Sequence, residues 1–126
     1  MTKAGDIYKC EICGNVVSVN EEGTGTLICC DKKMIRQDLK TSEEGNEKHR
    51  PIIEIENNKV KVRVGSIEHP MEENHHIRLI QLIKDNTPFV EKWLTCKDKP
   101  YAEFCINNHK GITARAFCNI HGLWSS

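Results

Sequence analysis

Cysteine constrains this chain more than any other residue type, because it occurs seven times in 126 residues and is unevenly placed. Four cysteines lie within the first 30 residues and three lie far beyond them: Cys10, Cys13, Cys29 and Cys30, then Cys96, Cys105 and Cys118. Residues 1–10 lack the apolar core of a secretory signal, so we expect a reducing, cytoplasmic location. Thiols in such a compartment are more often metal ligands or catalytic groups than disulfide partners, and their odd number points the same way.

The charge balance excludes several classes of function. The sequence has 18 basic and 18 acidic residues, hence no formal net charge and a pI near 7.0. Proteins that bind nucleic acid or membrane surfaces usually carry a basic excess, and no run of one sign is present. No apolar stretch approaches the roughly 18 residues of a membrane-spanning helix. We therefore expect a soluble protein with no nucleic-acid partner and no membrane partner.

The positions of cysteine and histidine predict two units. The first, residues 1–39, holds four cysteines and is too small for an apolar core to hold its fold, so a bound metal is expected to replace that core. The polar segment Lys40–Lys48, with Gly45 and Asn46, has the composition of a linker. The second unit, residues 40–126, contains all six histidines.

The second unit has the pattern of antiparallel strands. In Lys59–Val64 valines alternate with basic residues, and Pro51–Glu56 precedes it across an Asn-Asn turn, which predicts a hairpin with one wet face. Ile77–Ile83 is apolar on both faces and rich in β-branched residues, so it predicts a buried central strand. Tyr101–Ile106 and Gly111–Phe117 predict two further short strands. The expected fold class is all-β, with strands at the spacing of a sandwich or barrel.

The first cysteine cluster has the pattern of a metal site. Cys10 and Cys13 form a CxxC motif, and Gly14 after it permits the tight turn of a metal-binding knuckle. Cys29 and Cys30 add two thiolates, and four thiolates suit tetrahedral zinc or a single iron. Adjacent cysteines normally direct their side chains apart, so both can bind one ion only in a distorted site, which mildly favours a redox-capable iron.

Two alternatives for this cluster stay open. One is a purely structural metal site, whichever metal it holds. The other is a thioredoxin-like dithiol, which is less favoured because the valine-rich segment after the CxxC predicts a strand, whereas that motif needs a helix to lower the thiol pKa.

Histidines gather in turn-like segments of the second unit and, with one cysteine, predict a second site: His49, His69, the pair His75 and His76, Cys118 and His121. A lone histidine is usually a surface or packed side chain. Several imidazoles and a thiolate from loops at one end of a sandwich make a nitrogen-rich site for iron, copper or zinc. The CxxH spacing also suits blue copper, but Trp124 stands where the axial methionine would be, so copper is a minor alternative.

Five segments resemble the motifs of one family, in order along the chain. They are Tyr8–Asn15 (YKCEICGN), Ile28–Cys30 (ICC), Glu47–His49 (EKH), Glu68–His75 (EHPMEENH) and Cys118–Gly122 (CNIHG). Through these motifs the sequence resembles desulfoferrodoxin, the two-iron class of superoxide reductase. The resemblance implies a small desulforedoxin-like domain, followed by an immunoglobulin-like antiparallel β-sandwich that carries the active iron.

The resemblance also implies two iron ions per chain and a ligand set for each. The first iron would be bound by four cysteines: Cys10, Cys13, Cys29 and Cys30. The active iron would have four equatorial histidines and one axial cysteine: His49, His69, His75 and His121, with Cys118. Five protein ligands leave one position open for superoxide. The sequence departs from the family pattern at Arg50, Asn74 and His76, and spacing from the His-Pro motif favours His75 over His76 as the ligand.

Two residues beside His49 have expected catalytic roles. Lys48 would provide a local positive charge and a hydrogen-bond donor for the anion, which matters because the net charge offers no long-range attraction. Glu47 would, as the resemblance implies, occupy the open position after peroxide leaves. Either residue could instead be an ordinary solvated side chain.

The remaining histidines and cysteines have ordinary expected roles. His76 and His109 are expected to face solvent or to lie behind the ligands. Cys96 is expected to be a loop thiol, and Cys105 a strand residue packed as a small hydrophobe.

The expected function is superoxide reductase, the one-electron reduction of superoxide to hydrogen peroxide. A small electron donor such as rubredoxin and a homodimeric assembly are implied by the resemblance alone. Two alternatives stay open: an electron carrier in which both irons relay electrons, and a metal-stabilised structural module. An anion such as azide or cyanide would distinguish them, because only an open iron site changes its spectrum on binding.

Overall fold

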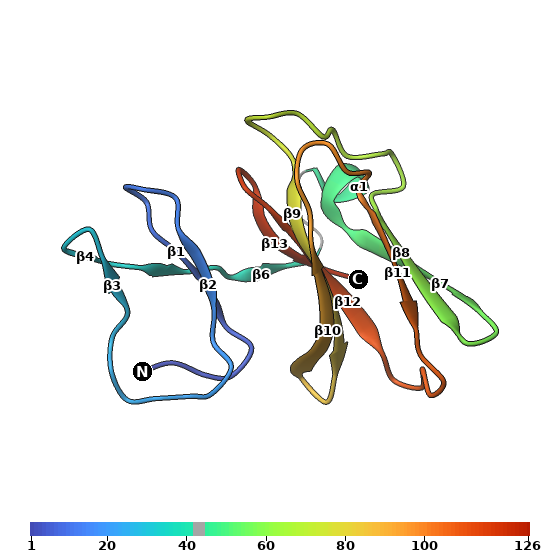
Figure 1. Ribbon diagram of the computed structural model, residues 1–126, viewed down its shortest axis with the longest axis horizontal. Coiled ribbons are helices and arrows are strands. Elements are labelled where there is room, and N and C mark those ends of the chain that lie inside the picture. The colour runs from blue at the N-terminus through green and yellow to red at the C-terminus, as the bar shows by residue number, and fades with distance from the viewer. Residues whose placement is uncertain (42–44) are drawn as a thin grey trace. The chain divides into compact units, whose positions relative to one another are not determined.

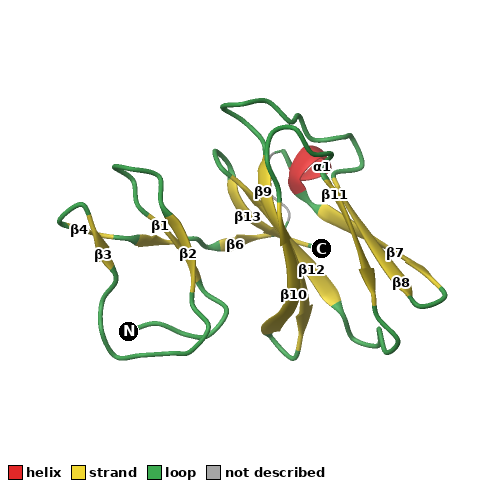
Figure 2. Cartoon of the chain, viewed as in Figure 1, coloured by secondary structure: helices red, strands yellow, loops and turns green. Residues whose placement is uncertain are grey.

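The computed structural model describes residues 1–41 and 45–126, which form two compact units, Met1–Asp38 and Leu39–Ser126. Part of the predicted linker, residues 42–44, lies outside the described residues. Within the described ranges all regular structure is strand except one helical turn, α1 (Asn46–His49), which is red in Figure 2. The predicted all-β fold class is confirmed.

The first unit consists of short antiparallel strands (Figure 1). One sheet has three strands in the order β2-β1-β5, and a separate hairpin joins β3 to β4. The bounds are β1 (Ile7–Lys9), β2 (Val16–Ser18), β3 (Ile28–Cys29), β4 (Lys32–Lys33) and β5 (Ile35–Arg36). The strand predicted after the CxxC motif is therefore present as β2. Ile7 and Cys10 are the buried apolar residues of this unit, a core so small that it agrees with the need for a bound metal.

The second unit contains two sheets. The larger has five strands in the order β10-β9-β12-β13-β6: β10 (Thr87–Trp93), β9 (Ile77–Lys84), β12 (Thr113–Cys118), β13 (Gly122–Ser125) and β6 (Leu39–Lys40). The smaller has three strands in the order β11-β8-β7: β11 (Tyr101–Cys105), β8 (Lys59–Val64) and β7 (Pro51–Glu56). Every paired strand of this unit is antiparallel except β6, which runs parallel to β13.

The predicted hairpin and central strand are confirmed. Strands β7 and β8 pair from Pro51↔Val64 to Glu56↔Lys59, so the Asn-Asn turn joins them as expected. The three valines of β8 are at most 1% exposed, whereas its basic residues are exposed or half-buried. Strand β9 is buried along most of its length and pairs on both sides, with β10 and β12.

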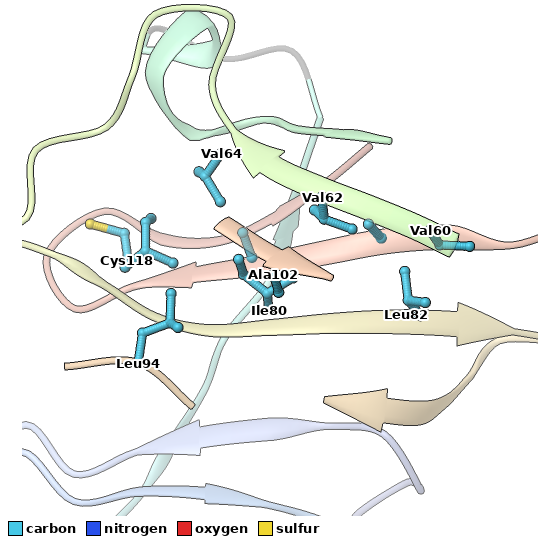
Figure 3. Close-up of a cluster of buried hydrophobic side chains, with 11 residues drawn as sticks. Val60, Val62, Val64, Ile80, Leu82, Leu94, Ala102 and Cys118 are labelled. Carbon is cyan, nitrogen blue, oxygen red and sulfur yellow. The ribbon is translucent and has the colours of Figure 1, made fainter. Parts of the chain in front are cut away.

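The core of the second unit lies between its two sheets. Valines of β8 and Ala102 of β11 face Ile80 and Leu82 of β9 (Figure 3). Cys118 lies at one edge of this cluster, at the end of β12, and Figure 3 shows its sulfur there in yellow. Burying each Val or Leu stabilises the fold by roughly 1.5 to 3 kcal/mol. The sandwich therefore holds β12 firmly at the point where the chain turns toward His121.

Two expectations about local structure need correction. The linker predicted over Lys40–Lys48 is wrong at both described ends, because Lys40 lies in β6 and Asn46–Lys48 lies in α1. Polar composition is common to linkers and to short exposed elements, so it could not separate the two. The strands β10 and β13 were not predicted. Among the described residues, no helix has the length and apolar character needed to cross a membrane.

Candidate metal centres

The four cysteines of the first unit converge on one point. Their sulfur atoms all lie within 4.8 Å of one another, and we call this group the cysteine centre: Cys10, Cys13, Cys29 and Cys30. The Sγ atoms of Cys13 and Cys29 are 3.5 Å apart, and those of Cys29 and Cys30 are 3.9 Å apart. Four sulfurs at such spacing are the donor set of a tetrahedral zinc or iron site.

The CxxC segment forms the turn between β1 and β2. The backbone N–H of Cys10 donates to the carbonyl of Asn15 at 2.8 Å, and that of Gly14 donates to the carbonyl of Cys10 at 3.0 Å. Gly14 has φ +83°, a left-handed conformation that glycine adopts without steric cost. The N–H of Cys13 lies 3.5 Å from the sulfur of Cys10. The tight turn therefore aims a backbone amide at a sulfur, as the motif predicts.

A hairpin turn brings the two adjacent cysteines to the same site. Cys29 ends β3 and pairs with Lys32 of β4, so Cys30 and Asp31 are the central residues of the turn. Their φ angles are +53° and +59°, and a type I′ turn requires positive values at both positions. The distortion expected for adjacent ligands is therefore located in the backbone of this turn.

The thiols of the cysteine centre differ in proton affinity. Hydrogen bonds from the backbone N–H groups of Cys13 and Ile12 lower the pKa of Cys10 to about 6. Hydrogen bonding with the other thiols, Cys13 first, raises the pKa of Cys29 and raises that of Cys30 to about 12. The thiolate of Cys10 thus stands beside the thiols of Cys29 and Cys30, which keep their protons, and a bound cation would displace those protons.

Four imidazole rings of the second unit form a nearly square arrangement: His49, His69, His75 and His121. Neighbouring ring centroids are 4.7 to 4.9 Å apart, and the His49–His75 diagonal is 6.4 Å. Neighbouring rings meet at 70° to 80°. Together with Cys118 we call these rings the histidine centre.

Cys118 joins this group from the end of β12. Its sulfur is 3.8 Å from Nδ1 of His121 and accepts the backbone N–H of His121 at 3.4 Å. The ligand atoms of His49, His75, Cys118 and His121 all lie within 4.8 Å of one another. His69 is outside that group of four, but its ring completes the square, 4.7 Å from His49 and 4.8 Å from His75.

Backbone carbonyls orient the rings. Nδ1 of His49 lies 2.8 Å from the carbonyl of Gly45, and Nδ1 of His69 lies 2.7 Å from that of Pro70. A carbonyl can only accept, so each Nδ1 carries the proton and each Nε2 presents a lone pair. Nε2 of His49 points to Nδ1 of His121 at 3.0 Å. His121 therefore presents Nδ1 and His49 presents Nε2 toward the middle of the square.

These rings fit a bound cation. Nε2 of His69 and Nε2 of His75 are buried and have no hydrogen-bond partner among the described residues. A buried nitrogen without a partner costs free energy, and a metal bond removes that cost. Burial is the largest cause of the lowered pKa of His49 and of His121. It is also the largest cause of the lowered pKa of His69, which is about 4. Burial therefore favours the neutral form of these three rings, the form that binds metal.

Asn119 fastens the loop that carries His75, and sequence reasoning missed it. Its Oδ1 accepts the backbone N–H of His76 at 3.0 Å, and its Nδ2 donates to the carbonyl of Asn74 at 3.0 Å. The two bonds fall on either side of His75 and tie it to the loop between Cys118 and His121. The signal available in the sequence was an asparagine between two predicted ligands, Cys118 and His121.

The residues predicted for catalysis lie on α1, directly before His49. Both side chains, of Glu47 and Lys48, are exposed. The carbonyl of Glu47 accepts the N–H of Ile67 at 3.0 Å and the hydroxyl of Ser66 at 3.2 Å. The helical turn is therefore fixed by its backbone to the loop before His69, while the two side chains extend from it.

The other predicted residues have mixed outcomes. His76 is buried, which excludes the solvent-facing alternative and agrees with the one behind the ligands; its Nδ1 lies 2.9 Å from the carbonyl of Glu72. His109 is half-buried. Cys96 lies in a loop as expected, but Cys105 is exposed and not packed as a hydrophobe, because β11 ends there and its neighbour across the pair is exposed Lys59.

Comparisons with known proteins agree with these two centres. A family model described as desulfoferrodoxin matches residues 41–126, and one described as the desulfoferrodoxin N-terminal domain matches residues 2–36. The chain is similar to a desulfoferrodoxin homolog from Archaeoglobus fulgidus, with 49% identity over 126 residues that cover 100% of this chain and 99% of the relative.

Proteins named superoxide reductase are also similar. One from Pyrococcus furiosus is 32% identical over 119 residues, which cover 74% of this chain and 96% of the relative. The solved structure of the superoxide reductase from Treponema pallidum has a TM-score of 0.76 and 24% identity, and the match covers 96% of this chain and 95% of that one. At this identity the second match shows a shared fold.

Proposed function

The chain belongs to the desulfoferrodoxin family, and from this membership we infer that it reduces superoxide to hydrogen peroxide at the histidine centre. Its activity is that of a superoxide reductase. The observation that supports this location best is the square of four imidazoles beside a buried thiol. Imidazoles and a thiolate together suit iron, whereas a structural zinc site needs no more than four ligands.

Each residue of the histidine centre has a proposed task. His49, His69, His75 and His121 would hold the ion together with Cys118. Imidazoles bind a metal in their neutral form and the thiolate would carry one negative charge, so this ligand set would leave a divalent ion with a net positive charge that attracts an anion. The sulfur of Cys118 would donate electron density to the ion, by analogy with thiolate-ligated haem. An iron held there would supply the one electron that the reaction consumes, and the two protons of hydrogen peroxide would come from solvent.

Glu47 and Lys48 are proposed as the catalytic side chains. The ammonium of Lys48 would attract superoxide and donate a hydrogen bond to it, because Lys48 directly precedes His49 and its side chain is exposed. The carboxylate of Glu47 would close the site once the product has left. Both proposals rest on the position of α1 and on the family motif.

The cysteine centre is proposed to hold the accessory iron of the pair. In this proposal residues 1–39 form the desulforedoxin-like domain and residues 40–126 the catalytic domain. Four sulfurs within 4.8 Å of one another support a single ion bound by Cys10, Cys13, Cys29 and Cys30. The centre shares no residue with the histidine centre.

The partners and the location of the enzyme are also proposed. Reduction of superoxide consumes one electron per turnover, so a small one-electron donor such as rubredoxin would return the histidine centre to its reduced form. A homodimer in the cytoplasm is the proposed assembly, and family membership supports it.

One experiment tests the proposed function. Chemically reduced protein with known iron content is mixed with superoxide in a stopped-flow instrument, and hydrogen peroxide and dioxygen are both measured. We expect one peroxide per superoxide consumed and no dioxygen from the enzyme. Two irons per chain without this reaction would indicate an electron carrier, and one zinc per chain would indicate a structural module; either result contradicts the proposal.

A further inference from the structure

The backbone carbonyl of His121 is held by two donors that the ligand set does not include. Nζ of Lys40 donates to this oxygen at 3.1 Å, and Nε1 of Trp124 donates to it at 3.0 Å. One of these donors is a full positive charge. The main chain of a metal-ligand residue is therefore in direct contact with a cation.

The same two side chains also reach the neighbouring corner of the square. The indole of Trp124 is 2% exposed and stacks on the ring of His49, with centroids 4.9 Å apart and planes at 19°. Nζ of Lys40 lies 5.5 Å from the centre of that indole, within the range of a cation–π contact. The charge of Lys40 thus acts on His121 through its carbonyl and on His49 through the indole.

Strand pairing fixes where Lys40 lies. It belongs to β6, which pairs in parallel with β13, and the register places Lys40 opposite Trp124 and Leu39 opposite Leu123. The side chain is half-buried. Pairing of β6 with β13 therefore holds the backbone of Lys40 close to His121, whereas no such pairing would hold a lysine at the tip of a surface loop.

Electrostatics support an effect on both rings. The ammonium of Lys40 contacts the carbonyl of His121 and lies over the indole that stacks on His49. A cation this close to both rings disfavours extra positive charge on an ion that they bind. Such a cation stabilises the reduced ion relative to the oxidised one.

We propose that Lys40 is a positioning residue of the histidine centre: its ammonium fixes the carbonyl of His121 and raises the reduction potential of the metal that His49 and His121 bind. This inference rests on the proposed function, in which that metal is iron. The segment that sequence analysis assigned to a linker thus contributes a residue that sets the driving force of the reaction.

The test is a redox titration of the histidine centre in four variants of the full chain, each with its iron content measured. Lys40→Met removes charge and donor, Lys40→Gln removes the charge but keeps an N–H donor, and Lys40→Arg keeps both. The matched control is Lys110→Met, which makes the same change of charge at an exposed residue. Lys110 lies in the loop before β12, and Cys118 lies at the opposite end of that strand. We expect the midpoint potential to fall in Lys40→Met and Lys40→Gln, and to stay near the wild-type value in the other two.

Equal potentials in Lys40→Met, Lys40→Gln and the wild type, with full iron, would overturn the proposal. A fall in Lys110→Met as large as that in Lys40→Met would also overturn it, because the effect would then be one of net charge. A wild-type histidine centre without iron would contradict the proposed function, on which this inference rests.

A second measurement reports on the positioning part whichever metal is bound. In zinc-loaded protein, the indole N–H resonance of Trp124 should shift in Lys40→Met, because Lys40 and this N–H donate to the same carbonyl oxygen of His121. The resonance should not shift in Lys110→Met. An unchanged resonance in Lys40→Met would show that Lys40 does not position this part of the centre.

Discussion

Single hydrogen bonds decide which ring nitrogen His49 and His69 present at the histidine centre. Carbonyls of Gly45 and Pro70 hold the Nδ1 protons of His49 and His69, so their Nε2 atoms face the middle. His121 presents the opposite nitrogen, because it follows Cys118 by only three residues and the turn brings its Nδ1 to 3.0 Å from Nε2 of His49. Changes at single residues can therefore alter the centre without altering the fold.

Lys48→Ala is expected to slow the reaction with superoxide without loss of iron, and Lys48→Arg to slow it less. One charge-assisted contact is worth up to about 3 kcal/mol when desolvated and near 1 kcal/mol when exposed, so a fall of roughly fivefold to a hundredfold is expected. Stopped-flow rates at low ionic strength measure it, with Lys110→Ala as the control. A rate for Lys48→Ala equal to that of the control would assign Lys48 to the solvated surface.

Asn119→Ala should weaken the histidine centre through His75. The variant loses two hydrogen bonds, each worth about 0.5 to 1.5 kcal/mol, and releases the loop that carries this ligand. Loss of a residue that orients a ligand typically lowers metal affinity about 10- to 100-fold. Competition with a chelator measures the affinity, and Asn107→Ala at an exposed loop position serves as the control. Equal iron retention in the two variants would refute the role of Asn119.

At the scale of elements, the helical turn α1 depends on one glycine in the loop after β8. Gly65 has φ +89°, and a Cβ placed on it would lie 2.8 Å from the carbonyl oxygens of both Glu47 and Lys48 and closer still to that of Ile67 in its own loop. Its own N–H donates to the carbonyl of Arg50 at 3.1 Å. The close approach leaves no room for a side chain, so Gly65 sets the distance between α1 and the sheet.

Gly65→Ala should therefore displace α1 and lower both stability and the rate with superoxide. Gly111→Ala is a matched control, since Gly111 also has positive φ, +73°, but has nothing within 4 Å of its Cβ position. The control reports the backbone strain alone, about 1 to 3 kcal/mol, and the excess in Gly65→Ala reports the displacement of α1 and of the loop at Ile67. Thermal unfolding and the superoxide rate measure both. Equal losses in the two variants would contradict the role assigned to Gly65.

Elements with a local signal could be predicted and elements with a non-local partner could not. The β7–β8 hairpin and β9 were predicted because alternation, turn residues and apolar runs lie within each segment. Strand β6 has two residues and exists only because it pairs with β13, more than 80 positions later. Strand β10 is an edge strand with Pro88 near its start and mixed exposure, so its pattern resembles that of a loop.

The same contrast holds for the site. Ligand types and spacings marked the two clusters, and the family resemblance implied nine ligands among them; the structure brings these nine residues into two groups. Residues that act through backbone groups, such as Lys40, Gly65 and Asn119, could not be found in this way. Their side chains carry no chemistry that marks a metal site, and their effect depends on which carbonyl or N–H the fold places beside them.

At the scale of the whole molecule, the two centres should be separable. Cys13→Ser removes one of four sulfurs and should release the metal of the cysteine centre, and residues 1–38 should lose stability because the metal supplies much of their folding free energy. Superoxide reduction by chemically reduced protein should persist. Metal analysis and stopped-flow kinetics on the same sample test this. A collapse of the rate while the second iron stays bound would show that the centres are not independent.

The central claim is that Cys118 and four imidazoles hold the iron that reacts with superoxide, and the optical spectrum of Cys118→Ser tests it most directly. A serine hydroxyl at neutral pH is a weak, protonated ligand, so the donation of electron density from sulfur is lost. We expect the oxidised variant to lose a visible thiolate-to-iron band while keeping that of the cysteine centre, and to lose activity with it. Iron content must be measured on the same sample. An intact band with full activity would contradict the claim and make Cys118 a buried core thiol, whose replacement costs about 1 to 3 kcal/mol of stability.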